Sequence, residues 1–357
     1  MNRKSEVNSQ TSSRCPARSR RCRVTLGAAA LLATVAFAAA CSTTSATGGS
    51  TSSATPASPS HSSAAAPKPA ERLPFGTIGR YAVAEHPLRM VDRTRVRLGP
   101  RVLLTTVWYP VIPTAAAASG RLARGLFPLV VFGPGYYVCV SSYSPLLRAW
   151  ASAGYVVAGI DFPRTNCRLT NPDENDMANQ PADMAYVIRR LLGISSGSRG
   201  FLDGLIDPGK IAVAGQSDGG DTVAALVANT CCVDRAVTVA ISLAGAEWPG
   251  FGGAYFTRPT PPMLFVQGDA DNINLPADSI QMYRADRTGP RFYLDLFGAA
   301  HLPPYEGEGP PAPVVARVTV DFLDRYLAGR RGAAAAMRRQ GNVAGVASLV
   351  GGSQPPP

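Results

Sequence analysis

The chain has 357 residues, of which 46% are hydrophobic and 17% are charged, so it has ample material for a buried core and is not disordered throughout. The formal charge is +11, but residues 1–40 hold seven Lys or Arg against one Glu, so more than half of this charge lies there. The rest of the sequence has no basic stripe with interleaved aromatic residues, and no nucleic-acid partner is therefore expected.

The first 41 residues, 1–41, have the pattern of an export signal. Basic residues precede an uncharged apolar stretch at 24–40, which ends in Ala-Ala-Ala and is followed directly by Cys41. This ending is similar to a bacterial lipobox, although Ala38 stands where that pattern favours Leu, and it predicts Cys41 as a lipidation site. Paired arginines before the stretch also resemble a twin-arginine signal, which leaves the export route open. Because 17 residues are near the lower limit for crossing a bilayer, an uncleaved anchor is the alternative.

Composition divides the rest of the chain into three parts. Residues 42–70 are rich in Ser, Thr, Ala and Pro, have no large apolar residue to bury, and are predicted to be a disordered tether that includes His61. The folded domain is expected over 71–329, and the small-residue-rich segment 330–357 is expected to be a flexible tail. The protein is accordingly predicted to be exported, as a cell-surface lipoprotein or a secreted bacterial protein.

Within the folded part, apolar runs alternate with amphipathic segments. Opening antiparallel strands are expected at 81–86 and 101–110, and buried strands at 126–133, 155–162, 210–215, 236–245, 262–268 and 291–298. Helices are expected at 144–154, 180–193, 219–229, 276–286 and 313–329. Apolar runs without alternation are typical of strands buried on both faces, so we predict an α/β fold with a mostly parallel sheet of about eight strands and helices on both sides.

A serine between glycines stands where such a sheet binds ligands. Ser217, in "AGQSDGG", follows the strand at 210–215 and precedes the helix at 219–229, which is the strand-turn-helix context of a G-x-S-x-G nucleophile. The alternative is a flexible turn with an incidental serine.

A serine nucleophile needs a base and an acid, and the chain has only three histidines. His61 lies in the tether and His86 precedes the parallel strands, so His301 is the candidate base; a loop histidine packed on prolines is the alternative. Asp269 and Asp271 both follow the preceding strand, and periodicity does not separate them.

With these positions placed, residues 75–328 resemble the α/β-hydrolase superfamily, whose G-x-x-D motif implies Asp271 as the acid and Asp269 as a turn or capping residue. The loop "FGPGYYV" is similar to that of the bacterial cutinase, polyester hydrolase and platelet-activating-factor acetylhydrolase-like branch. The resemblance implies the backbone N–H groups of Tyr136 and Asp218 as oxyanion donors. Polyester hydrolases usually have an apolar residue in place of Asp218, so the resemblance supports the chemistry more than a polyester substrate.

The remaining features concern access and crosslinks. Residues 246–261 are too few for a large cap domain, so we expect an open site with Trp248 as a substrate contact; packing of this ring under a loop is the alternative. The four cysteines of the folded part fit no zinc motif, and their pairing is open from sequence. Cys139 and Cys167 follow neighbouring strands, which favours a disulfide between them, whereas the adjacent Cys231 and Cys232 have no evident role.

Together these features predict an exported serine esterase that cleaves carboxylic esters through an acyl-enzyme, with no cofactor and no metal. The expected partner is a small-molecule or lipid-like ester, with membrane contact only through a lipid anchor and with the chain as a monomer. An acyltransferase or amidase with the same triad is an alternative. So is a non-catalytic, surface-tethered binding protein on a hydrolase fold.

Overall fold

The computed structural model describes residues 78–95, 97–114, 117–197 and 200–352, which belong to one compact unit, Pro69–Pro357. The predicted signal at 1–41 with Cys41, and the predicted tether with His61, lie outside the described residues. Among the helices that are described, none combines the length and the apolar character needed to cross a membrane.

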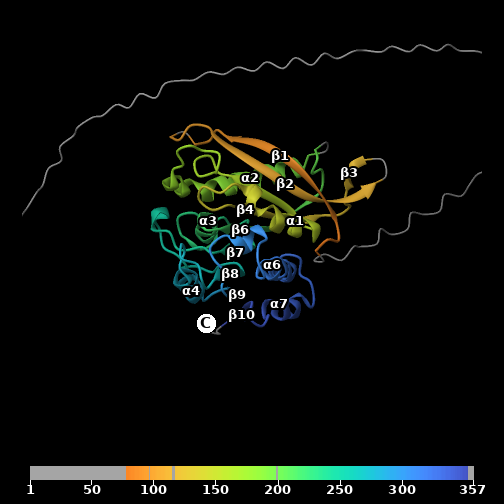
Figure 1. The fold of residues 1–357 in the computed structure, drawn as a ribbon. Helices are drawn as coiled ribbons and strands as arrows, with labels where there is room; N and C mark the ends of the chain where they lie inside the picture. Colours follow the sequence, from red (N-terminus) through yellow and green to blue (C-terminus); the bar gives the residue numbers. More distant parts are fainter. Residues whose placement is uncertain (1–77, 96, 115–116, 198–199, 353–357) are drawn as a thin grey trace, which may run out of the picture. The chain divides into compact units, whose positions relative to one another are not determined.

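Strands and helices alternate along the described chain (Figure 1). The strands are β1 (Ala82–Asp92), β2 (Arg101–Thr114), β3 (Ala117–Leu122), β4 (Phe127–Gly133), β5 (Val156–Asp161), β6 (Ile206–Gln216), β7 (Val239–Leu243), β8 (Met263–Gly268), β9 (Arg291–Leu296) and β10 (Ala347–Gly351). The α-helices are α1 (Ser144–Ser152), α2 (Gln180–Ser195), α3 (Asp218–Ala228), α4 (Pro276–Ala285), α5 (Pro303–Glu306), α6 (Ala312–Tyr326) and α7 (Ala333–Gly341). Short 3-10 helices are η1 (Val140–Tyr143), η2 (Glu174–Asn179) and η3 (Pro249–Phe251).

All the described strands form one sheet, in the order β1-β2-β5-β4-β6-β7-β8-β9-β10, with β3 paired to β2. Neighbours from β5 through β9 run parallel, whereas β1, β2 and β3 at one end and β10 at the other pair antiparallel. The predicted fold class, a mostly parallel sheet with helices on both faces, is confirmed.

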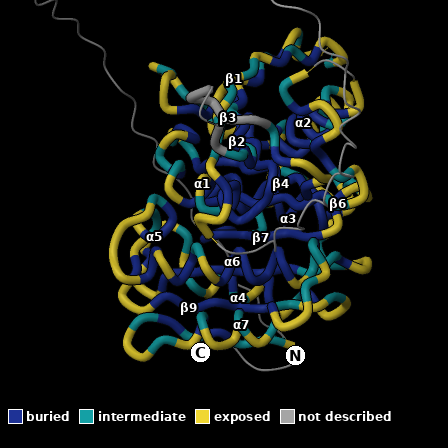
Figure 2. Tube along the Cα trace, turned by 90° about the vertical axis from the view of Figure 1, so that its right-hand side faces the viewer, coloured by how far each residue is buried: buried dark blue, intermediate teal, exposed yellow. Residues whose placement is uncertain are grey.

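The central strands are buried on both faces because their side chains alternate between two cores. On β4, Val130 and Phe132 point to one core, and Leu129 and Val131 point to the other. The first core is completed by α1, α6 and α7, and the second by α2, α3 and α4, on opposite sides of the sheet in Figure 1. Figure 2 shows the same layering, with buried strands at the centre and exposed loops around them. This is why the strand sequences lack alternation.

The end of the chain differs from expectation. The predicted flexible tail at 330–357 contains α7 and β10, and β10 pairs antiparallel with β9 through Leu349 and Leu294. The expectation is corrected over 333–351, because Met337 and Leu349 are buried and extend the first core. Small residues let α7 pack closely, since a Cβ on Gly341 would lie 2.7 Å from the Leu349 side chain. Composition alone suggested fraying because it does not show that a sheet edge is free to receive another strand.

The order of the strands fixes where a site can form. The chain leaves β4 for β5 on one side and returns to β6 on the other, so the order reverses at β4. Ligand sites of open parallel sheets lie outside the carboxyl ends of the strands at such a reversal. The loop after β4 and the turn after β6 meet at this point.

Candidate active site

The turn between β6 and α3 holds Ser217 in a backbone conformation that side chains rarely adopt. Its φ is 54° and its ψ is −123°, and the residue is the N-cap of α3, with 8% of its surface exposed. A non-glycine residue at positive φ is costly and is found where a function requires it. The sharp turn raises the hydroxyl above the end of β6, as in a nucleophile elbow.

The flanking glycines are required by close packing. A Cβ on Gly215 would lie 2.1 Å from the Gly219 carbonyl oxygen, and a Cβ on Gly219 would lie 1.9 Å from the Gly133 carbonyl oxygen. A Cβ on Gly135 would meet the Cβ of Ser217 at 3.1 Å. The loop after β4 therefore lies against the serine, and no larger residue fits at the first two positions.

Three predicted residues are brought together across the carboxyl ends of β6, β8 and β9. The Nε2 atom of His301 lies 2.9 Å from Oγ of Ser217, and its Nδ1 atom lies 2.7 Å from Oδ2 of Asp271. Asp271 is buried, and 12% of the His301 side chain is exposed. The contacts form one chain of hydrogen bonds from carboxylate through imidazole to hydroxyl.

The carboxylate of Asp271 is held by donors on several sides. Its Oδ1 accepts the backbone N–H groups of Ile273 at 2.9 Å and Asn274 at 3.2 Å, and its Oδ2 accepts Nε2 of Gln267 at 2.9 Å. These bonds fix the orientation of the carboxylate toward the imidazole. Asp269 instead faces away, with its Oδ1 accepting the N–H of Gly298 at 2.6 Å, a turn contact.

The sequence did not identify two buried glutamines that bond to His301 and Asp271. Gln216 donates from Nε2 to the His301 carbonyl at 3.0 Å and accepts the Tyr143 hydroxyl at 2.7 Å. Gln267 accepts the hydroxyl of Ser279 at 2.6 Å. Both side chains are fully buried. A signal was available, because each is a polar residue that ends an otherwise apolar strand.

The two predicted oxyanion donors belong to the two segments that pack against Ser217. Asp218 opens α3, so its N–H has no acceptor within the helix. In the loop after β4, the N–H of Gly135 bonds the Tyr143 hydroxyl and the N–H of Tyr137 bonds the Thr165 carbonyl. The N–H of Tyr136, between them, has no hydrogen-bond partner among the described residues. The N–H groups of Tyr136 and Asp218 belong to the two elements that pack on Ser217, and that of Asp218 also interacts with its own carboxyl group.

The side chain of Asp218 is unusual for a residue beside a nucleophile. It is 6% exposed, and its Oδ2 atom has no hydrogen-bond partner. Burial, and then the charge of Glu174, raises the pKa of this carboxyl to about 7, while its own backbone N–H acts in the opposite direction. This carboxyl therefore changes charge in the neutral range, a property common at functional sites.

One disulfide and one aromatic loop follow the carboxyl ends of strands near the site, and a second disulfide follows α3. Cys139 and Cys167 form the expected disulfide, which ties the loop after β4 to the loop after β5, and Cys231 is bonded to Cys232. Trp248 is half-buried, edge-on to the Phe251 ring at 4.9 Å, and its carbonyl accepts the Tyr255 hydroxyl. The Trp248 ring packs within its own loop. Its contact with substrate stays a prediction.

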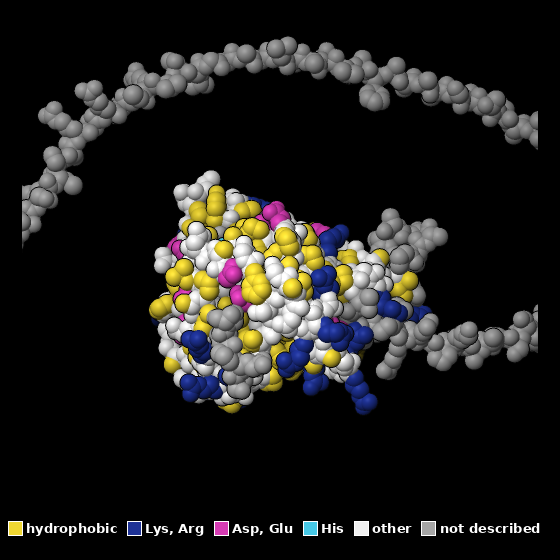
Figure 3. Space-filling model, turned by 60° about the horizontal axis from the view of Figure 1, so that its bottom comes forward, with side chains coloured by type: hydrophobic (Ala, Val, Ile, Leu, Met, Phe, Trp, Pro, Cys, Tyr) yellow, Lys and Arg dark blue, Asp and Glu magenta, His cyan; other side chains and the backbone are white. Residues whose placement is uncertain are grey.

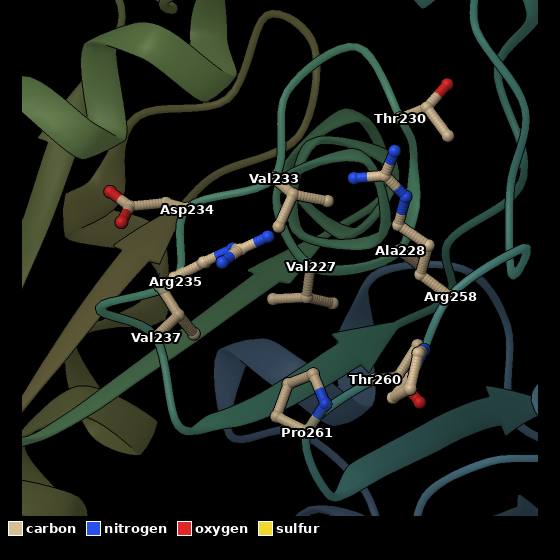
Figure 4. Close-up of a pocket in the computed structure, with 11 residues that line it drawn as sticks. Val227, Ala228, Thr230, Val233, Asp234, Arg235, Val237, Arg258, Thr260 and Pro261 are labelled. Carbon is tan, nitrogen blue, oxygen red and sulfur yellow. The ribbon is translucent and has the colours of Figure 1, made fainter.

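Other chemically active side chains lie away from this site. His86, on β1, stacks on Phe201 with ring centroids 4.0 Å apart. A cavity of about 460 Å³ is bordered by the loops that enter β7 and β8, at the opposite edge of the sheet from Ser217. Figure 4 shows Arg235 and Arg258 reaching over its apolar floor. No group of His, Cys, Asp and Glu able to hold a metal occurs in the described ranges.

A doubly wound sheet with a serine on a strained turn after a central strand, facing a histidine after a later strand, defines the α/β hydrolases. The chain belongs to the PET hydrolase-like family, which it matches over residues 101–332. It is also similar to the bis(hydroxyethyl) terephthalate hydrolase of Streptomyces coelicolor, at 26% identity over 272 residues that cover 74% of this chain and 75% of that protein. The predicted resemblance to the cutinase and polyester hydrolase branch is thereby confirmed, and the protein is a carboxylic ester hydrolase.

Proposed function

We propose that this protein is an exported serine esterase that works through an acyl-enzyme on Ser217, with His301 as the base and Asp271 as the residue that orients it. The observation that carries the proposal is the continuous chain from Asp271 Oδ2 to His301 Nδ1, at 2.7 Å, and from His301 Nε2 to Ser217 Oγ, at 2.9 Å. This order of contacts makes a serine hydroxyl nucleophilic.

The geometry supports the following sequence of steps. With Nδ1 donating to Asp271, the Nε2 atom of His301 accepts the Ser217 proton while Oγ bonds to the ester carbonyl carbon. The carbonyl oxygen becomes an oxyanion, which the N–H groups of Tyr136 and Asp218 stabilise. His301 then gives its proton to the departing alcohol. His301 next takes a proton from water, whose oxygen attacks the acyl carbon of the Ser217 ester, and then returns that proton to Oγ of Ser217 as the acid leaves.

We propose a small ester as the substrate. The loop between β7 and β8 contains only the short helix η3, so no large domain covers the carboxyl ends of the strands in the described chain. The relative from Streptomyces coelicolor is named for a small diester of terephthalate, which supports a soluble ester rather than a polymer as substrate.

The first experiment is turnover of a p-nitrophenyl ester by the full chain, with fluorophosphonate labelling of the same samples. Ser217→Ala is expected to abolish labelling and to lower kcat by about 10⁴-fold or more, because no other group supplies the nucleophile. Ser242→Ala is a matched control, since that buried serine bonds the Gly220 carbonyl and not the imidazole. Labelling that persists in Ser217→Ala would contradict the proposal.

Export and lipidation are part of the same proposal and rest on the sequence of residues 1–41. Metabolic labelling with a palmitate analogue in a bacterial host is expected to mark the wild-type chain and not Cys41→Ala. A full-length chain that stays in the cytoplasm would contradict export. For a nucleic-acid partner there is no support, and the Lys and Arg side chains on the face in Figure 3 stand in separate groups.

A further inference from the structure

The carboxyl group of Asp218, the residue after the nucleophile, has no part in the proposed mechanism. Asp218 contributes only its backbone N–H to that mechanism, yet its carboxyl group is buried directly beside Ser217, with an Oδ2 atom that has no hydrogen-bond partner. A buried carboxyl oxygen without a partner costs free energy, and this one lies in the residue that follows the nucleophile. An apolar side chain there would avoid this cost.

A second acid faces the same space from a different element. Glu174 is exposed at the start of η2, and its charge is the largest electrostatic influence on Asp218. No basic side chain of the described chain forms an ion pair with either residue. The neighbouring Asp173 has a cation, Arg164, at 3.8 Å. Asp218 and Glu174 therefore leave negative charge on one side of the site that the protein itself does not balance.

Aromatic surface lies between and beside these acids. The hydroxyl of Tyr136, on the oxyanion loop, reaches the Pro172 carbonyl at 3.3 Å, just before η2. Partial burial, and then the charges of Glu174, Asp218 and Asp173, raise the pKa of its phenol. On the other side, η3 packs against η2, and Trp248 precedes η3. An aromatic face beside unbalanced carboxylates is the combination that attracts organic ammonium ions.

We propose that Asp218 and Glu174, with the ring of Tyr136, make this a site for esters that carry an ammonium group near the scissile carbonyl. The inference rests on the proposed function, since it concerns the substrate of the same Ser217. A cation there supplies the charge partner that Asp218 lacks, whereas a neutral ester of the same shape leaves both acids unbalanced.

The preference is expected to depend on pH, because Asp218 must be charged to act. Its pKa of about 7 lies above the ordinary value for Asp, so the carboxyl is neutral below that pH and charged above it. The other titratable groups that face it are Glu174 on η2, Tyr136 on the oxyanion loop, Tyr143 on η1 and Asp221 one turn along α3. His301, bonded to Ser217, acts on both kinds of ester alike. A ratio of rates therefore isolates Asp218.

The test uses acetylcholine and its uncharged carbon isostere, 3,3-dimethylbutyl acetate, with the full chain. The measured quantity is the ratio of kcat/KM for the cationic ester to that for the neutral ester. We expect the wild type to favour acetylcholine by roughly tenfold at about pH 8, and by only about twofold at about pH 6.

Two variants and a control test whether the preference comes from the charges of Asp218 and Glu174. Asp218→Asn keeps the side-chain shape without the charge and is expected to reduce the ratio to about two at both pH values, because Glu174 keeps its charge. Glu174→Gln, at an exposed position, is expected to reduce it by about twofold and to move the pH dependence to lower pH, because the Glu174 charge helps to raise the pKa of Asp218. Asp203→Asn removes an exposed carboxylate before β6, at the far edge of the sheet, and is expected to leave the ratio unchanged.

The outcomes separate the inference from the proposed function. Loss of both activities in Ser217→Ala, with a wild-type ratio near one at every pH, would overturn the ammonium site and leave the esterase intact. Turnover of either ester by Ser217→Ala would overturn the proposed function. A ratio that is high but equal in Asp218→Asn would also overturn the inference, because the charge would then be irrelevant.

Discussion

Two regions of the molecule bury aspartates beside cationic or basic groups, and only one of them has the geometry of a catalytic site. At the carboxyl ends of the strands, Asp271 bonds His301, which bonds a serine hydroxyl. Under β1 and β2, Arg101 bridges Asp183, with Nη2 2.5 Å from Oδ2, and Asp176, with Nη2 2.7 Å from Oδ2. In the Arg101 cluster the charged groups pair with one another, whereas the Asp271 cluster leads to Oγ of Ser217, which can react.

The difference shows that burial of charge by itself does not mark a site. Arg101 and its two aspartates are nearly inaccessible and fully paired, so they stabilise the packing of β2 on η2 and α2. The two regions are linked, because η2 carries both Asp176, which Arg101 holds, and Glu174, which faces Asp218. The structural cluster thus positions an acid of the proposed site. Four predictions follow from this division of roles.

The largest effect is expected for Asp271→Asn. An amide in this place favours the wrong tautomer of His301 and does not stabilise the imidazolium, so kcat for a p-nitrophenyl ester is expected to fall by about 10⁴-fold. The free energy of unfolding should change by only about 1 kcal/mol, since the side-chain oxygen still accepts the backbone bonds. Asp269→Asn is the control, with activity within about threefold of wild type. A loss of similar size in that control would remove the distinction between the two aspartates.

Arg101→Met is expected to have the opposite effect, with a large loss of stability and little loss of activity. It leaves Asp176 and Asp183 buried without their main cation, and chemical denaturation should show a loss of about 3–5 kcal/mol in the free energy of unfolding. At a temperature where the variant is folded, kcat per folded molecule should be within about threefold of wild type. Arg148→Met, which breaks an exposed pair with Glu85, should cost less than about 1 kcal/mol. Equal losses of stability in Arg101→Met and Arg148→Met would contradict the claim that a buried ion pair matters more than an exposed one.

The disulfide beside the oxyanion loop should have an intermediate effect. Cys139 and Cys167 are 28 residues apart, and replacing both by Ala frees a loop whose closure is worth about 3 kcal/mol in the unfolded chain. Replacing Cys231 and Cys232 by Ala is the comparison, with an expected loss of about 1 kcal/mol or less because those residues are adjacent. Thermal unfolding measures both. A larger loss in the second pair would show that loop closure is not the cause.

The smallest effect is expected for Asp321→Asn, on α6. Burial, and then the charge of Asp324, raises the pKa of this carboxyl to about 6, and its Oδ2 has no partner. The folded protein holds this proton more tightly than the unfolded chain, so stability falls as pH rises from about 4 to about 6. Because Asn does not ionise, the free energy of unfolding of the variant should exceed that of the wild type by about 1 kcal/mol at pH ~8. The two should be equal near pH ~4. A difference that does not vary with pH would contradict this cause.

The candidate site was predictable from the sequence because its residues stand at fixed places in a repeating pattern. Ser217 and His301 each follow an apolar run, and parallel strands bring such positions to one edge. Asp271 was separable from Asp269 only through the family resemblance, since both follow the same strand. The glutamines at 216 and 267 were missed because a polar residue at a strand end has many possible partners. Only the assembled fold shows that these two meet His301 and Asp271.

By itself, the sequence determined the class of fold, the order of most strands and helices, and the triad candidates. These depend on local periodicity and on the one-to-one relation between a buried strand and the turn that follows it. The tertiary structure decided that β10 and α7 complete the sheet and core, that Arg101 is paired inside the protein, and that Asp218 is not. These features depend on partners more than 40 residues away, and the desolvation of a charge is set by everything that surrounds it.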